Sequence, residues 1–213
     1  MEKIACGDHY INAIVSIKPN SKLNIILSHG ENNDMDYGLL VKLFDSLKSD
    51  YSIIRFNFSY VDGGLKKDTN INKMEIEACI KYLGGKDIVL IGKSYGGILS
   101  TRIGAEKILG ILSIIVLGYP LHEYENPSNL NDVSYLKIIQ IPIKFIIGEK
   151  DPNCNIDIFN KVLSNYKPEI INNSDHSYRP INGTCSLNEN EDKVITIVKK
   201  ELYTLAKSRD SDN

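Results

Sequence analysis

The sequence predicts an α/β fold: a doubly wound, mostly parallel sheet with helices on both faces. Short apolar runs alternate along the chain with segments whose apolar residues recur at helical spacing. Most of these runs are continuously apolar, which is typical of strands that are covered on both faces. The chain has 213 residues, enough for one domain and too few for two comfortable ones. We therefore expect a single domain over residues 1–207 and a frayed tail over residues 208–213.

Seven short runs bounded by turn residues are typical of strands. They lie at residues 11–17, 23–28, 51–58, 87–92, 111–117, 141–147 and 169–171. The first of them, which ends at Lys18-Pro19-Asn20, is a candidate for antiparallel pairing. The others are expected to form the parallel part of the sheet.

The intervening segments predict helices. Leu40, Leu43, Phe44 and Leu47 recur at offsets 0, 3, 4 and 7, which marks one buried helix face. Further helical segments are expected at residues 71–82, 97–107, 156–166 and 194–205, with a short helix at 133–139. Only about two dozen residues separate the strand before Gly118 from the strand beginning near Ile141. We therefore expect no cap domain.

Composition excludes several function classes. The formal net charge of −2 gives no electrostatic reason to expect a nucleic-acid or membrane partner. No apolar stretch approaches the roughly 18 residues of a membrane helix. The four cysteines form no CxxC pair, so we expect reduced thiols in the cytoplasm, no metal site and no cofactor. The sequence identifies no protein partner.

The chemistry is concentrated in a G-x-S-x-G pattern, Gly92-Lys93-Ser94-Tyr95-Gly96. It lies between a buried strand and a helix, the place of a strained turn that exposes a nucleophilic serine. Side chains two residues before and after Ser94 would collide, which explains the two glycines. The alternative is a phosphate-binding loop, but that motif requires glycine at position 87, which is Asp87.

A serine needs a base, and the base needs an orienting carboxylate. Of the four histidines, only His122 and His176 follow Ser94, and only His176 also follows a plausible acid at a strand end. Asp151 comes directly after the strand at 141–147, so its carboxylate can reach the loop of His176. We therefore predict a triad of Ser94, Asp151 and His176.

Three other acids are alternative partners for the histidine. Glu149 is expected to point away from His176, and Asp157 to lie inside the next helix. Asp175 would have to fold back on its own neighbour. None of them is favoured over Asp151.

The surroundings of the triad are predicted from position in the chain. The backbone amides of Tyr95, at a helix N-terminus, and of Glu31, after His29-Gly30, are expected to form the oxyanion hole. His29 is expected to shape that loop. Tyr119, His122 and Tyr60 are candidate substrate-binding residues.

With this triad assigned, the sequence resembles the α/β-hydrolase superfamily. Within it, the chain is similar to a small lidless group allied to dienelactone-hydrolase-like proteins, which includes a hydrolase-like subunit of a chromatin acetyltransferase complex. The segments that carry the resemblance are Leu27-Ser28-His29-Gly30, Arg55-Phe56-Asn57-Phe58, Gly92-Lys93-Ser94-Tyr95-Gly96-Gly97, Gly118-Tyr119-Pro120-Leu121-His122, Ile141-Pro142-Ile143 and Gly148-Glu149-Lys150-Asp151.

The chain departs from that group in two places. Dienelactone hydrolases use a cysteine nucleophile, so their substrate does not carry over to a chain with serine at position 94. Related proteins often have small residues after His-Gly, where this chain has Glu31-Asn32-Asn33-Asp34.

Two functions from different classes follow. The first is a serine hydrolase that cleaves a small acyl ester or thioester through an acyl-enzyme; a peptidase would use the same machinery. The second is a non-catalytic interaction protein that keeps the fold. A triad within hydrogen-bond reach favours the enzyme, and a scattered one favours the interaction protein.

Overall fold

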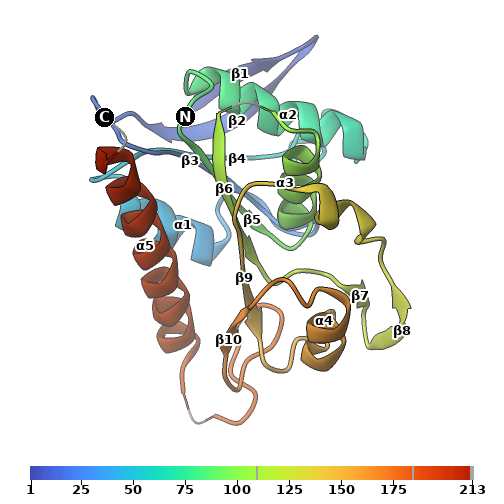
Figure 1. The fold of residues 1–213 in the computed structure, drawn as a ribbon. Helices are drawn as coiled ribbons and strands as arrows, with labels where there is room; N and C mark the ends of the chain where they lie inside the picture. The colour runs from blue at the N-terminus through green and yellow to red at the C-terminus, as the bar shows by residue number, and fades with distance from the viewer. Residues whose placement is uncertain (109, 184, 212–213) are drawn as a thin grey trace.

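The core of the molecule is an eight-stranded sheet with the strand order β1-β2-β4-β3-β5-β6-β9-β10 (Figure 1). The computed structural model describes residues 1–108, 110–183 and 185–211. The strands of the sheet are β1 (Glu2–Cys6), β2 (His9–Ser16), β3 (Asn24–Ser28), β4 (Ser52–Phe56), β5 (Ile88–Lys93), β6 (Ile111–Leu117), β9 (Ile143–Gly148) and β10 (Glu169–Ile171). The helices are α1 (Gly38–Leu47), α2 (Thr69–Tyr82), α3 (Tyr95–Ala105), α4 (Ile156–Val162) and α5 (Leu187–Ser211).

Six of the eight strands run parallel, from β4 through β10. At one edge, β2 pairs antiparallel with both β1 and β4. The predicted fold class is therefore confirmed, including the antiparallel first run. Strand β1 was not predicted, because it is short and buries only Ile4 and Cys6.

Helices cover both faces of the sheet. Side chains from α2 and α3 pack on one face together with Ile88 and Leu90 of β5. Side chains from α1 and α5 pack on the other face together with Val89 and Ile91. All six residues of β5 are consequently buried, which explains its continuous apolar sequence.

The segment between β6 and β9 is a surface connection with little structure of its own. It contains a two-stranded hairpin, β7 (His122–Glu123) and β8 (Asn126–Leu130), and a 3₁₀ turn, η1 (Ser134–Ile138). All five residues of β8 are exposed. Residues 118–142 thus form no cap domain, as predicted.

Helix α5 continues through Ser211, into the segment 208–213 for which we expect a frayed tail. Two contacts hold its last turns: Ala206 packs in the core, and the guanidinium of Arg209 lies 2.7 Å from the Asp87 carboxylate. Helix α4 is shorter than predicted and ends at Val162.

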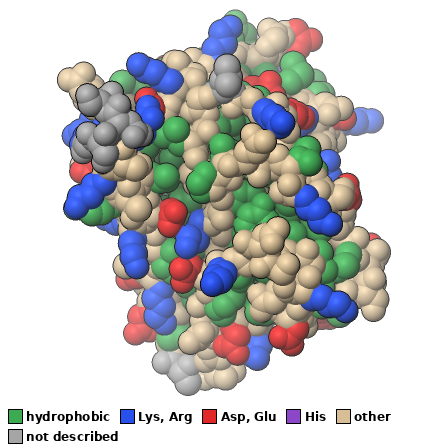
Figure 2. All heavy atoms as spheres, viewed as in Figure 1, with side chains coloured by type: hydrophobic (Ala, Val, Ile, Leu, Met, Phe, Trp, Pro, Cys, Tyr) green, Lys and Arg blue, Asp and Glu red, His purple; other side chains and the backbone are tan. Residues whose placement is uncertain are grey.

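Figure 2 shows Lys, Arg, Asp and Glu side chains interspersed over one face, in line with the net charge of −2. None of the helices in the described part of the chain is long and apolar enough to cross a membrane.

Candidate active site

Ser94 lies at a sharp turn between β5 and α3. Its φ of 52° is in the left-handed region, which serine adopts at a cost in strain. Gly92 and Gly96 make the turn sterically feasible. A Cβ on Gly92 would lie 2.4 Å from the backbone carbonyl carbon of Gly96, and a Cβ on Gly96 would lie 2.6 Å from the carbonyl oxygen of Ser28. The glycine pair is therefore required by close backbone contacts.

The three predicted triad side chains lie within hydrogen-bond distance of one another. His176 Nε2 is 3.0 Å from Ser94 Oγ, and His176 Nδ1 is 2.7 Å from Asp151 Oδ2. An ionised carboxylate only accepts hydrogen bonds. His176 Nδ1 therefore carries the proton and donates a hydrogen bond to Asp151. Nε2 then has a lone pair for the Ser94 hydroxyl. This is the arrangement that a general base needs.

Two loops at the carboxyl ends of β9 and β10 carry the acid and the base. We call residues 148–155 the acid loop and residues 172–180 the base loop. The Asp151 side chain is fully buried, and its second oxygen accepts the N–H of Asn153 at 2.8 Å. The His176 side chain keeps 20% of its surface exposed. The carboxylate is thus held in place while the imidazole stays accessible.

The two loops are packed tightly against each other. The N–H of Lys150 donates to the carbonyl of Ser174 at 2.8 Å. A Cβ on Gly148 would lie 2.2 Å from the carbonyl oxygen of Asp175. Within the base loop, the Asp175 carboxylate accepts the N–H groups of Ser177 at 2.8 Å and Arg179 at 2.9 Å. Asp175 therefore shapes the turn that carries the histidine and does not orient its ring.

The loop after His29-Gly30 lies directly beside the nucleophile. A Cβ on Gly30 would be 3.4 Å from the Cβ of Ser94. His29 is fully buried: its Nε2 accepts the N–H of Phe58 at 3.1 Å, and its Nδ1 donates to the carbonyl of Gly30 at 2.7 Å. Burial lowers the pKa of His29, which favours this neutral form. His29 thus has the contacts of a residue that shapes this loop.

The Glu31 carboxylate is paired with a lysine. It forms an ion pair with Lys67, and its side chain is 52% exposed. Its carbonyl oxygen accepts the hydroxyl of Tyr60 at 3.1 Å. Lys67 Nζ also lies 4.9 Å from the centre of the Tyr95 ring. Tyr95 is the first residue of α3, so its amide has no acceptor within the helix.

Two of the three candidate substrate-binding residues have buried side chains. Tyr119 is 1% exposed, with its ring against Phe145 and its hydroxyl 2.9 Å from that of Tyr135. His122 is 3% exposed, and its Nε2 accepts the N–H of Asn155 at 2.9 Å. Both side chains are used for packing. Tyr60 remains partly exposed beside Glu31.

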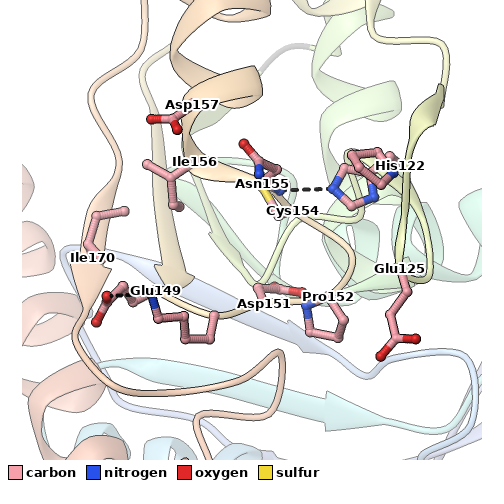
Figure 3. Close-up of a pocket in the computed structure, with 12 residues that line it drawn as sticks. His122, Glu125, Glu149, Asp151, Pro152, Cys154, Asn155, Ile156, Asp157 and Ile170 are labelled. Atoms are coloured by element: carbon pink, nitrogen blue, oxygen red, sulfur yellow. Dashed lines mark hydrogen bonds and ion pairs between the residues drawn. The ribbon is translucent and has the colours of Figure 1, made fainter.

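A cavity of about 530 Å³ is lined by much of the acid loop, including Asp151 and Pro152. Figure 3 shows Asp151 and Pro152 at one side of it and the hydrogen bond between His122 and Asn155 at another. Its wall also includes the rejected acid candidates Glu149 and Asp157, and it includes neither Ser94 nor His176. Glu149 accepts the N–H of Asn173 at 2.8 Å, and Asp157 lies in the first turn of α4.

Two observations bear on a phosphate-binding or metal site among the described residues. Lys93, which would contact phosphates in a nucleotide-binding loop, is 1% exposed at the end of β5. Among the described residues, no group of three or more His, Cys, Asp or Glu side chains could hold a metal ion. The sequence drew attention to Lys93 only as part of the alternative motif, and its burial could not be read from the pattern.

Comparison with known proteins places the chain in a family. A family model described as an alpha/beta hydrolase domain matches residues 21–203. No curated protein matches the chain by sequence.

Solved structures of low sequence identity share the fold. An alpha-beta serine hydrolase homologue from Coxiella burnetii superposes with a TM-score of 0.75 at 13% identity, covering 94% of this chain and 96% of its own. XC6422 from Xanthomonas campestris, a serine hydrolase without a lid, has a TM-score of 0.70 at 16% identity and covers 93% of each chain. Est1E from Butyrivibrio proteoclasticus, solved with ferulic acid bound, has a TM-score of 0.69 at 17% identity, covering 95% of this chain and 100% of its own. At these identities, the likeness concerns the fold.

Proposed function

Because the chain belongs to the alpha/beta hydrolase domain family, we propose that it is a serine hydrolase that cleaves small acyl esters or thioesters. The observation that carries the proposal is the continuous hydrogen-bonded chain from Ser94 Oγ through the imidazole of His176 to the Asp151 carboxylate, with distances of 3.0 and 2.7 Å. A chain that had lost catalysis would have no need to keep a strained serine, a base and a buried acid in this arrangement.

The first half of the reaction forms an acyl-enzyme. Ser94 Oγ attacks the carbonyl carbon of the substrate while His176 Nε2 takes the hydroxyl proton. Asp151 stabilises the imidazolium that forms. His176 then gives the proton to the departing alcohol or thiol as the bond to the acyl carbon breaks. In the second half, water attacks the acyl-enzyme with His176 as the base, and Ser94 recovers its proton when the acid leaves.

Negative charge on the carbonyl oxygen needs fixed N–H donors, and we assign the amides of Tyr95 and Glu31 to this role. The Tyr95 amide is at the N-terminus of α3, where the helix dipole also favours an anion. The ion pair with Lys67 keeps the Glu31 carboxylate occupied, which reduces its repulsion of the oxyanion. A single amide of this kind contributes roughly 10²- to 10³-fold to turnover.

The substrate class follows from the open surroundings of the site. Residues 118–142 form no cap over Ser94. This segment therefore provides no hydrophobic tunnel that could bury a long acyl chain. XC6422 is likewise described as lidless, and Est1E as binding ferulic acid. By analogy, we propose that the acyl group of the substrate of this chain comes from one small carboxylic acid. Tyr60 is the candidate residue at its edge.

A chain-length series of p-nitrophenyl esters and matching thioesters tests this proposal. We expect turnover to be highest with short acyl groups and to need both Ser94 and His176. Ser94→Ala and His176→Ala should each lower kcat by about 10⁴-fold or more. Ser134→Ala, a change of an exposed serine in η1, is the matched control and should leave kcat unchanged.

The alternative function, a non-catalytic interaction protein, predicts a different result from the same experiment. A folded wild-type protein that turned over every ester and thioester no faster than Ser94→Ala would favour it over the hydrolase. A cytoplasmic location is also part of our proposal, and the four cysteines, all present as free thiols, support it.

A further inference from the structure

The residue before the nucleophile is a lysine that the mechanism above does not use. Lys93 is the last residue of β5 and is 1% exposed. Along β5, Val89 and Ile91 pack against the core formed by α1 and α5. Lys93 follows at the same alternate spacing, so its side chain enters that face of the sheet. The Lys93 side chain therefore lies in the interior, on the face of the sheet that α1 and α5 cover, and not in the solvent.

Gly118, which directly follows β6, fixes where the amine lies. A Cβ on Gly118 would be 3.0 Å from Lys93 Nζ, 3.1 Å from the carbonyl oxygen of His176 and 3.2 Å from His176 Cε1. The amine and the catalytic imidazole thus approach the same point above Gly118. Gly118 has φ of 63°, so both its conformation and this crowding require glycine.

The charged and titratable groups that face Lys93 come from the two catalytic loops. Asp151 of the acid loop and Asp175 of the base loop favour its protonated form, whereas burial opposes it and is the larger effect. The pKa of Lys93 is consequently lowered from 10.5 to about 8. Tyr178 of the base loop is buried nearby and stays protonated, because burial raises its pKa. His176 is the remaining titratable neighbour.

We propose that Lys93 is a positioning residue whose buried ammonium draws the acid loop and the base loop onto the nucleophile strand. The amine shares the space at Gly118 with the ring and the backbone carbonyl of His176, and its charge attracts the carboxylates of Asp151 and Asp175, one on each loop. Because Asp175 shapes the turn that carries His176, this attraction keeps the imidazole in register with Ser94. The role in catalysis rests on the proposed hydrolase function.

Lys93→Met tests the proposal, since methionine has a similar length and no charge. We expect kcat to fall roughly 10- to 100-fold with KM nearly unchanged, because a misplacement of about 1 Å has effects of this size. The wild-type rate should also decline with a midpoint near pH 8, where the ammonium loses its proton. The variant should show no such decline. Lys199→Met, which removes an exposed lysine from α5, is the control and should keep the wild-type rate and profile.

Amide hydrogen exchange of the base loop at pH 7 separates this proposal from the hydrolase function. In residues 172–180, Lys93→Met should exchange faster than both the wild type and Lys199→Met. Faster exchange in a protein whose wild type has no turnover would support the positioning role and overturn the hydrolase. Wild-type exchange in Lys93→Met, together with an unchanged rate and pH profile, would overturn the positioning role.

Discussion

Glu75 and Lys93 are both buried charged residues, and the regions around them serve different purposes. Glu75, in α2, is 0% exposed, and its carboxylate accepts bonds from the ring of His9, the N–H of Ser59 and the amide of Asn72 at 2.9–3.4 Å. It fastens α2 to the N-terminal hairpin and to the loop after β4. The charge of Lys93 is opposed instead by two carboxylates, Asp151 on the acid loop and Asp175 on the base loop. A buried charge whose hydrogen bonds are all made, such as Glu75, indicates a structural role. A buried charge with a shifted pKa beside a candidate nucleophile, such as Lys93, indicates a functional role.

The largest effect is expected at the carboxylate that the Lys93 region supports. Asp151→Asn should lower kcat by about 10⁴-fold without unfolding the protein, because an amide favours the wrong tautomer of His176. Steady-state kinetics and circular dichroism measure the two quantities. Asp157→Asn, an exposed acid at the start of α4, is the matched control, and an equal loss there would contradict the assignment of Asp151.

The next effect concerns stability and the Glu75 region. Glu75→Ala should lower the free energy of unfolding by roughly 3 kcal/mol, because it leaves several buried donors without an acceptor. Activity per folded molecule should stay near the wild-type value, since Glu75 contacts none of the triad. Glu77→Ala, on the same helix, should change stability by no more than about 0.5 kcal/mol. Denaturant titration of both variants gives the comparison; equal stabilities would show that the hydrogen bonds of Glu75 contribute nothing.

Replacing Lys93 is expected to raise the free energy of unfolding, whereas replacing Glu75 is expected to lower it. The unfolded lysine keeps a pKa near 10.5 and the folded one has about 8, so the unfolded state binds more protons between these values. Wild-type stability should therefore rise as pH increases from 8 to 10.5. Lys93→Met should be more stable than the wild type at pH 7 by about 1–3 kcal/mol, and the difference should close towards pH 10.5. Melting temperatures across this range test it, and a variant less stable at pH 7 would refute the sign.

The smallest effect is expected at the ion pair beside the oxyanion site. Lys67→Ala should change stability by about 0.5 kcal/mol or less, because the pair is exposed. Turnover should fall a few-fold, since the Glu31 carboxylate loses its partner and can oppose the oxyanion. Adding Glu31→Gln should restore the rate, and Lys66→Ala should have no effect. A Lys67→Ala rate that Glu31→Gln failed to rescue would show that the carboxylate is not the cause.

Sequence predicted the parts of the molecule that are dictated locally. The nucleophile turn was predictable because two glycines are required by backbone contacts of 2.4–2.6 Å, and the parallel strands because burial on both faces leaves continuous apolar runs. Strand β8 was missed because all of its residues are exposed and give no hydrophobic pattern. The packing of Tyr119 against Phe145 depends on residues far apart in the chain, so its burial could not be read from its neighbours.

The burial of the Lys93 side chain likewise could not be predicted from its neighbours in the sequence. A lysine between a glycine and a serine is predicted to be exposed or to bind phosphate. The reason is that lysine is almost never fully buried without a partner. Its environment is created by Gly118 and by the two catalytic loops, which come from three separate strand ends. Only the assembled sheet brings these together.

Covalent labelling with a fluorophosphonate tests the central claim most directly. The wild-type protein should take up one label, located at Ser94 by peptide mass spectrometry, and His176→Ala should label at least about 100-fold more slowly. Ser94→Ala should take up none. A folded wild-type protein that labels no faster than Ser94→Ala, or that carries its label on another residue, would contradict the account.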